Sequence, residues 1–380
     1  MFSFTEEQLD IQSMVRKFAE KEIRPLAQEI DQTGRFPAET IAKLAEMGIM
    51  GMNIPEEYGG AGLDEICKVL VISEISRCCA STAEIVAVHL LVNDIIKNNA
   101  TQEQKERILP MAAEGKLGAF CLTEPGAGSD AGGLKTKAVQ DGDDYIINGS
   151  KCFISNLGKD EGSHFVVIAL TDPEKKTKGG MTAFLIERDT KGLSLGKTED
   201  KMGMNGAAVS ELILEDCRVP KTAIMGKVGD GFRIAMSGLD GGRIGIASQA
   251  FGLAQGALEE AVAYSKNRIQ FGKPICKNQG LSWYLADMAT RVEAARLLTL
   301  EAADARMKGK NATKAAAMAK YYAAETATYV CDLALQIHGG YGYMKDYAIE
   351  RMYRDARILR IYEGTSEIQK MVISREVLKD

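Results

Sequence analysis

Histidine is scarce in this 380-residue sequence: there are only three, and they lie far apart in the chain. A metal centre built from clustered histidines is therefore not indicated, and we expect no metal ion. Eight cysteines are present, but none forms a C-x-x-C pair, and most lie in apolar periodic segments. We expect them to be reduced core residues rather than disulfides.

Long apolar runs and blocks of basic residues are also missing. No run approaches the ~18 apolar residues that cross a bilayer, and no apolar segment with a cleavage site stands at the N-terminus. A net charge of −5 without a lysine or arginine cluster argues against a nucleic-acid or membrane-surface partner. We therefore expect a cytoplasmic globular protein of about two or three domains.

The N-terminal part of the chain, residues 1–119, shows the apolar periodicity of helices. Two capping boxes, Thr5 with Gln8 and Thr101 with Gln104, mark expected helix starts. This part is predicted to form a helical domain.

The middle of the chain, residues 120–228, changes to the alternating pattern of strands. Asp141-Gly142 predicts a hairpin, and Asn148-Gly149 predicts a second turn. Further strands are expected at 165–170, 182–186 and 209–214. We expect a β domain here, without long helices.

Helical periodicity returns over residues 229–380 and persists to the end of the chain. The long helical segments are expected at about 231–267, 279–308, 312–337 and 346–360. Long helices joined by short loops predict an antiparallel four-helix bundle. The expected class is α+β, with an N-terminal helical domain, a middle β domain and a C-terminal bundle.

A candidate base lies near the C-terminus, where Glu363 and Gly364 precede a predicted helix. Ser366 with Gln369 forms a capping-box pattern, so the helix is expected to start just after Ser366. Glu363 then stands where helix amides point outward, which suits a held carboxylate or a bound phosphate. An ordinary capping or solvated glutamate fits the local pattern as well.

A glycine-rich stretch opens the β domain. Gly126-x-Gly128-x-x-Ala131 fits the dinucleotide fingerprint formally. However, Pro125 precedes it, and the residues that follow show the alternation of a strand rather than the periodicity of a helix. We therefore reject that interpretation. The loop, with the hydroxyls of Thr123 and Ser129, can still bring backbone amides to a ring system or phosphate. A plain inter-domain turn is the alternative.

Three other places carry groups suited to ligand binding. Phe153 and Ser155 are two residues apart, which puts both side chains on one face of a strand. Asp240 and Arg243 are neighbours on a helix that two glycines interrupt, and a structural ion pair explains them equally well. Arg268, at a helix end, can offer a bidentate fork to a pyrophosphate.

Four motifs together carry a resemblance. L-T-E-P-G-A-G-S-D, R-x-Q-F-G, Q-I-H-G-G-Y-G-Y and I-Y-E-G-T-S-E-I-Q occur in this order and in an α–β–α setting. In this the chain resembles the acyl-CoA dehydrogenase family over essentially its whole length, and it looks most like the short-chain (butyryl-CoA) members. The resemblance implies FAD as cofactor and a β-barrel-like middle domain.

The resemblance also implies a set of site residues. Glu363 matches the family's usual catalytic base, whereas Gly242 occupies the position from which isovaleryl- and long-chain-type members supply theirs. FAD contacts are implied for Phe120, Leu122, Thr123, Gly128, Ser129, Phe153, Ile154, Ser155, Arg268, Phe271, Gln279, Gln336, Gly339, Gly340, Thr365 and Glu367. Of these, Arg268, Gln279 and the stretch from Gln336 to Gly340 would reach the FAD of a neighbouring subunit. Acyl-CoA contacts are implied for Ser129, Asp240, Arg243 and Gly364.

The activity implied is α,β-dehydrogenation of a short-chain acyl-CoA, with the α-proton passing to Glu363 and a hydride to flavin N5. Electrons would pass to an electron-transferring flavoprotein, and the chain would assemble as a homotetramer. Three alternatives stay open at this point. The same site can run in reverse as an enoyl-CoA or aryl-acryloyl-CoA reductase, it can be an oxidase, or the chain can be an inactive CoA- or flavin-binding scaffold.

Overall fold

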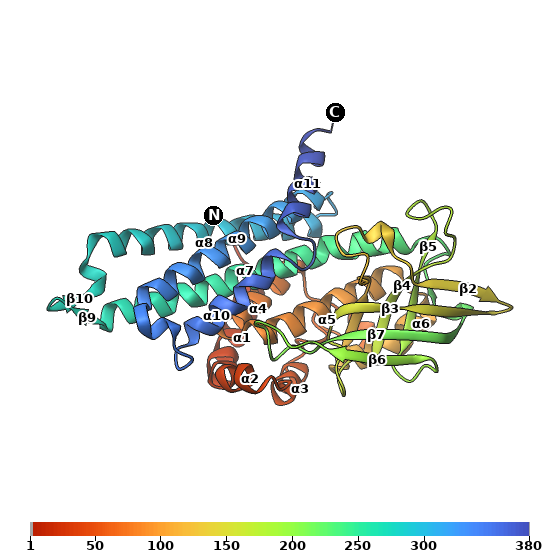
Figure 1. Cartoon of the computed structure of the whole chain (residues 1–380), viewed down its shortest axis with the longest axis horizontal. Coiled ribbons are helices and arrows are strands. Elements are labelled where there is room, and N and C mark those ends of the chain that lie inside the picture. Colours follow the sequence, from red (N-terminus) through yellow and green to blue (C-terminus); the bar gives the residue numbers. More distant parts are fainter. Residues whose placement is uncertain (1–2, 380) are drawn as a thin grey trace.

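The computed structural model describes residues 3–379 and shows the expected order of helices, sheet and helices (Figure 1). The N-terminal helices are α1 (Glu6–Phe18), α2 (Ala27–Thr33), α3 (Ala38–Glu46), α4 (Glu65–Cys78), α5 (Ala80–Asn99) and α6 (Gln102–Ala113). Both predicted capping boxes are confirmed, with Thr5 and Thr101 as N-caps. Helices α4 and α5 are buried over most of their length, because α7 and the sheet cover them.

The middle domain is built on an eight-stranded sheet. Its strands are β1 (Gly118–Cys121), β2 (Lys137–Asp141), β3 (Asp144–Ser155), β4 (His164–Leu170), β5 (Met181–Glu187), β6 (Leu193–Thr198), β7 (Val209–Pro220) and β8 (Ile224–Met225). The strand order is β6-β7-β3-β2-β4-β5-β8, and β1 pairs in parallel with β4. Strands β1, β6 and β8 were not predicted from the sequence, because they are short or only half-buried.

One turn prediction is confirmed and the other is wrong. Asp141 pairs with Asp144 across the predicted hairpin. At Asn148-Gly149, however, β3 continues, and its register against β7 shifts there instead. Gly149 has φ +150°, and a Cβ on it would come 2.5 Å from the Oγ1 of Thr136. The glycine therefore serves a bulge and a close approach, not a chain reversal.

The C-terminal part is a bundle of long helices. Its elements are α7 (Gly231–Asn267), the hairpin strands β9 (Ile269–Gln270) and β10 (Lys273–Pro274), α8 (Gln279–Met307), α9 (Thr313–His338), α10 (Ala348–Ala356) and α11 (Ser366–Val377). The predicted break at Gly241-Gly242 is absent, because α7 is continuous. Glycines on α7 instead allow close packing on α4: a Cβ on Gly252 would lie 2.4 Å from the backbone oxygen of Ser73.

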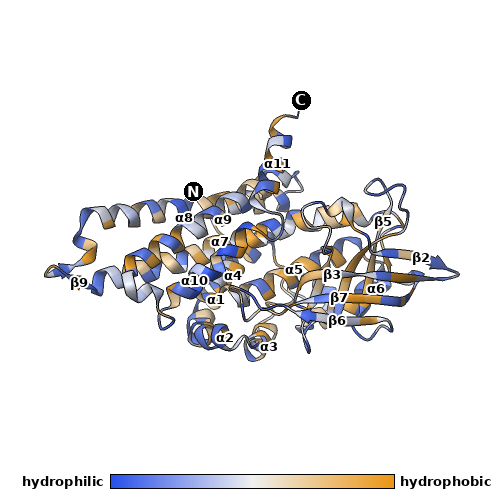
Figure 2. Ribbon diagram, in the orientation of Figure 1, coloured by the Kyte–Doolittle hydropathy of each residue, from blue (hydrophilic) through white to orange (hydrophobic). Residues whose placement is uncertain are grey.

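Apolar residues gather where these layers meet (Figure 2). Seven of the eight cysteines are buried and all eight are free, as expected of core residues. Among residues 3–379, none of the helices is both long and apolar enough to cross a membrane. Within the same range, no cluster of histidine, cysteine or acidic side chains is arranged to hold a metal ion.

Candidate active site

Glu363 lies in the loop that leads into α11, and its backbone conformation is unusual. Its φ is +53°, and Gly364 follows with φ +88°. A left-handed conformation at a non-glycine residue costs about 1–3 kcal/mol and persists only where the surroundings hold it. Here Gln369 Nε2 donates to the carbonyl oxygens of Glu363 (3.1 Å) and Gly364 (2.9 Å). Lys320 Nζ on α9 donates to the Gly364 oxygen as well, at 2.7 Å.

The helix cap next to this loop differs from the prediction by one residue. Thr365, not Ser366, is the N-cap, and its Oγ1 accepts from the N–H of Ile368. Ser366 Oγ donates instead to Glu325 (2.7 Å). The Gln369 side chain is likewise drawn to the loop carbonyls rather than to the cap. Long-range partners have therefore replaced the local capping pattern.

Glu363 is half-buried, and one of its carboxyl oxygens is withdrawn from water. Its Oε2 atom is buried and has no hydrogen-bond partner in the described part of the chain. Burial raises the pKa of Glu363 to about 7, and the charge of Glu84 adds to that rise, while the cations Arg243 and Lys320 oppose it. A carboxyl that titrates near neutral pH can both accept and return a proton, which suits a general base.

The carboxyl packs against the backbone of α7 at Gly242. A Cβ on Gly242 would lie 2.7 Å from Glu363 Oε2, so a side chain there would displace the carboxylate. Gly242 is the position where other members of the resembled family carry their base. The carboxylate beside Gly242 therefore comes from the loop, and it fits there because glycine has no side chain.

Two of the implied acyl-CoA residues stand beside this base. Arg243 is buried on α7 and donates through Nη1 to Asp240 Oδ1 (2.6 Å). Asp240 in turn accepts from Thr313 Oγ1 (2.7 Å). Arg243 Nε is buried without a partner in the described residues. The ion pair suggested by the sequence is confirmed, and it leaves the buried Nε donor without a partner among residues 3–379.

Sequence reasoning missed several residues that surround Glu363. Lys320 is fully buried, and burial lowers its pKa to about 8. Glu84 is also buried, and it accepts from Ser155 Oγ at 2.7 Å. Tyr362 OH donates to Gln249 Oε1. A signal did exist for Lys320 and Glu84: each is a lone charge among apolar or small residues on a helix.

The glycine-rich loop and β3 meet at a strained bulge. The N–H of Cys152 donates to the carbonyl of Thr123 (2.9 Å), and the β3–β7 register shifts between Lys151 and Ile154. Phe153, inside that shift, has φ +58° and is 66% exposed. The strand expected to carry Phe153 and Ser155 is therefore present but irregular, because a bulge lies at Phe153.

A buried ion pair fixes this loop to the sheet. Lys151, with no exposed surface, donates to Glu124 Oε1 (2.7 Å) and to the Leu122 carbonyl (3.1 Å). Glu124 also accepts from the N–H groups of Lys135 (2.6 Å) and Thr136 (3.0 Å). The other loop positions implied for FAD differ in exposure: Gly128 and Ser129 are exposed, Phe120 and Thr123 half-buried, and the Leu122 and Ile154 side chains lie in the core.

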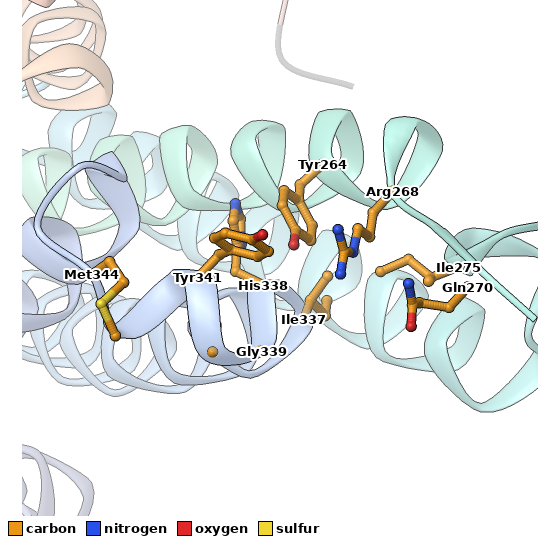
Figure 3. A pocket seen from close by; sticks show the side chains of 10 residues that line it. Tyr264, Arg268, Gln270, Ile275, Ile337, His338, Gly339, Tyr341 and Met344 are labelled. Carbon is orange, nitrogen blue, oxygen red and sulfur yellow. The ribbon is translucent and has the colours of Figure 1, made fainter.

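Three of the remaining implied FAD residues, Arg268, Gly339 and Gly340, line a cavity of about 490 Å³ where α7 and α9 end (Figure 3). Arg268, which follows α7, lies with its guanidinium carbon 5.2 Å from the Tyr341 ring centroid. Gly339, the C-cap of α9, has φ +59°, and a Cβ on Gly339 or Gly340 would meet nothing within 4 Å. Of the remaining implied residues, Phe271, Gln279, Gln336 and Glu367 are exposed, and Thr365 is half-buried.

These residues form two groups that the fold holds apart. One group surrounds Glu363 and the β3 bulge, while the other lies by the β9–β10 hairpin at the opposite end of the bundle from the sheet (Figure 1). Both groups fit parts of a flavin dinucleotide. An exposed, strained phenylalanine suits a flat ring, and open glycines beside an arginine suit a pyrophosphate.

Three domain signatures cover most of the chain. Residues 5–116 match the acyl-CoA dehydrogenase N-terminal domain, 119–217 the middle domain and 229–378 the C-terminal domain. The chain belongs to the acyl-CoA dehydrogenase family. It is therefore a flavoprotein oxidoreductase that uses FAD.

Individual relatives match along their whole length. Acryloyl-CoA reductase (NADH) of Anaerotignum propionicum is 52% identical, covering 100% of this chain and 96% of the relative. The structure of butyryl-CoA dehydrogenase from Megasphaera elsdenii superposes with TM-score 0.97 at 43% identity, covering both chains fully. A chain from a structural study of the electron-transferring flavoprotein of Acidaminococcus fermentans and flavin-based electron bifurcation superposes with TM-score 0.98 at 46% identity, again covering both chains fully.

The contact at Gly242 generates a prediction. Gly242→Ala places a methyl group only 2.7 Å from Glu363 Oε2, so the carboxyl must move, and we expect turnover to fall about 100-fold, the effect of a misplacement near 1 Å. Bound FAD should remain. Gly245→Ala is the matched control on the same helix, because its Cβ would meet neighbours only at 3.8 Å. Steady-state rates within twofold of wild type for Gly242→Ala would contradict this account.

Proposed function

We propose that the chain interconverts a short-chain acyl-CoA and its 2,3-enoyl-CoA, with Glu363 as the group that exchanges the α-proton. The observation that carries the proposal is the Glu363 carboxyl itself. Its Oε2 atom is buried, has no hydrogen-bond partner among residues 3–379, and packs against Gly242. A solvated or capping glutamate would have none of these features.

The chain's own groups explain how a carboxylate can act on a carbon acid. In water, a pKa near 4 makes a carboxylate a weak base for an α-proton. Burial raises the pKa of Glu363 to about 7 and so strengthens the base. Bound FAD would supply hydride exchange at the β-carbon. The backbone N–H of Glu363 donates to no acceptor among residues 3–379, so it is free for the thioester oxygen.

The same groups serve both directions of the reaction. A base that removes the α-proton during oxidation returns it during reduction. The relative named acryloyl-CoA reductase and the structure named butyryl-CoA dehydrogenase represent the two directions, and both names concern short acyl chains. We therefore propose a substrate of about four carbons and keep enoyl-CoA reduction as the second candidate function. An inactive scaffold is disfavoured, because the enclosed base is intact.

Replacing the base tests the assignment. Glu363→Gln keeps the shape of the side chain but cannot take a proton, so we expect FAD and butyryl-CoA binding to persist while turnover falls by several orders of magnitude. Wild-type flavin reduction by butyryl-CoA should rise with pH through about 7, because the ionised carboxylate is required; crotonyl-CoA reduction should fall over the same interval. Anaerobic stopped-flow measures both. Activity within about tenfold of wild type, ~1.4 kcal/mol, would refute the assignment.

The electrons must be exchanged with a separate protein. The Gly126–Ala131 stretch is followed by a 3-10 turn and β2 rather than by a long helix, so it lacks the context of a nicotinamide fingerprint. The cysteines of the sequence also lack iron–sulfur spacing. We propose an electron-transferring flavoprotein as the partner, in keeping with the Acidaminococcus study.

This partner assignment predicts that the purified chain alone has negligible NADH-dependent activity on crotonyl-CoA. Turnover should appear when an electron-transferring flavoprotein is added with its own electron source. Omitting this chain from the same mixture is the control. Rapid NADH oxidation coupled to crotonyl-CoA reduction by the single chain would overturn the assignment.

We also propose that the chain forms a homotetramer in the cytoplasm. The two groups of FAD residues lie at opposite ends of the bundle, so a neighbouring subunit is needed to bring them to one cofactor. Helix α11 stands away from the bundle with Met371, Val377 and Leu378 exposed, and Phe271 at the hairpin tip is 96% exposed. Such apolar surfaces are typical of subunit contacts. Eight free cysteines suit a reducing compartment.

The tetramer has a direct test by sedimentation velocity at several protein concentrations. We expect a single tetrameric species with FAD bound. Arg268→Ala should lose FAD while the tetramer persists, because Arg268 lines the cavity at the bundle end. A fully FAD-loaded monomer would contradict the proposal.

A further inference from the structure

The site contains a second buried carboxyl that the proposed chemistry does not use. Glu84 on α5 is only 3% exposed. Its Oε1 accepts a hydrogen bond from Ser155 Oγ at 2.7 Å. Its Oε2 has no hydrogen-bond partner among residues 3–379, yet it is not one of the atoms sealed inside the protein. Glu84 Oε2 therefore keeps some accessible surface and has no hydrogen-bond partner among residues 3–379.

No cation of the described chain pairs with Glu84. Lys201 is the cation whose charge lowers the pKa of Glu84. Its Nζ is engaged elsewhere, because it donates to the carbonyl of Ala207 at 2.9 Å. Burial raises the pKa of Glu84 to about 7. Leaving a carboxyl buried without a cation is costly, and buried acidic groups that serve only the fold are normally paired. Glu84 lacks the partners of a structural ion-pair residue.

The position of Glu84 connects it with the base. Glu84, Ala87 and Leu91 lie on one face of α5, at spacings of three and seven residues. Leu91 Cδ2 lies 3.4 Å from the Cβ position of Gly242, the same point that the Glu363 carboxyl contacts. Seven residues of an α-helix span about 10 Å. This face of α5 therefore extends from the neighbourhood of the Glu363 carboxyl to Glu84.

Electrostatics and packing agree with this path. The charge of Glu84 raises the pKa of both Glu363 and Tyr362. The Tyr362 hydroxyl is already engaged, because it donates to Gln249 Oε1. Gln249 in turn donates to the Ala80 carbonyl on α5 (2.9 Å). Neither neighbour is therefore available as a donor to Glu84 Oε2.

We propose that Glu84 is a specificity-determining residue whose free oxygen accepts a hydrogen bond from an ammonium or hydroxyl group on the acyl chain, beyond the two reacting carbons. The proposal rests on the proposed function, because Glu363 marks where those carbons lie. A plain alkyl chain offers no donor and would leave the buried carboxyl unpaired. An acyl chain that ends in a hydrogen-bond donor supplies the missing partner of Glu84. A buried polar site discriminates most strongly against a substrate that lacks the group with which it forms a hydrogen bond.

The test compares three thioesters of equal chain length on the FAD-loaded enzyme: valeryl-CoA, 5-hydroxyvaleryl-CoA and 5-aminovaleryl-CoA. Anaerobic stopped-flow gives the flavin reduction rate and the dissociation constant for each. We expect wild type to prefer at least one donor-bearing chain over valeryl-CoA by about tenfold or more. Glu84→Val should abolish or invert that preference, because valine has no acceptor.

Two further variants separate the possible causes. Glu84→Gln keeps a carbonyl acceptor without charge, so a hydroxyl preference should survive it and an ammonium preference should not. Asp355→Asn is the matched control: Asp355 is another buried carboxyl, and it already accepts from the N–H of Met204 (2.6 Å). Its charge raises the pKa of Glu84, but it leaves the acceptor at Glu84 in place, so the preference for a donor-bearing chain should persist. FAD content and the unfolding midpoint verify that each variant is folded.

Each outcome decides the question. Equal losses on all three thioesters in Glu84→Val would show that Glu84 only positions Ser155, and would overturn the proposal. A wild-type preference for plain valeryl-CoA would overturn it as well. If Glu84→Val does not hold FAD, the proposal is decided by the preference among the three thioesters in the wild type and in Glu84→Gln. If no thioester reduces the flavin, the proposed function fails, and equilibrium binding of the same three compounds then tests Glu84 separately.

Discussion

The contact between the Glu363 carboxyl and the bare backbone of Gly242 is the constraint on which the rest of the site depends. The carboxyl leaves water only because α7 presents no side chain at that point. To reach this position, Glu363 must adopt a positive φ, and such a conformation needs support from outside the loop. Gln369 and the buried Lys320 give that support through the loop carbonyls. The strain of the loop and the strength of the base thus both depend on this one contact.

The charges around the base show that its pKa results from opposing effects. Burial and Glu84 raise the pKa of Glu363, whereas Arg243 and Lys320 lower it. Each pKa unit corresponds to about 1.4 kcal/mol of differential interaction, so a change of one neighbour alters the base measurably. Asp240 takes part indirectly, because it fixes the Arg243 guanidinium. Residues that never contact the reacting carbons therefore help to set the proton affinity of the residue that does.

The sequence predicted the features that depend on local pattern. Capping boxes at Thr5 and Thr101, the Asp141-Gly142 hairpin and the long C-terminal helices depend on neighbours a few residues away, and they are confirmed. The failures involve distant partners. Ser366 turns to Glu325 on another helix, and Asn148-Gly149 becomes a bulge because β7 continues alongside it. For Lys320 and Glu84 the sequence shows a lone charge in an apolar helix, but only the folded chain shows that both charges lie near Glu363.

The charge of Glu84 acts on the pKa of Glu363, and a substrate group bound to Glu84 can alter that effect. An ionised, unpaired Glu84 raises the pKa of Glu363 and so favours proton removal from an acyl-CoA. A cation paired with Glu84 would compensate its charge, and the pKa of Glu363 would fall. A weaker base is also a more ready proton donor, so a positively charged acyl chain would shift Glu363 toward returning a proton to an enoyl-CoA. Through Glu84, the far end of the acyl chain can therefore influence which direction of the reaction the base serves better.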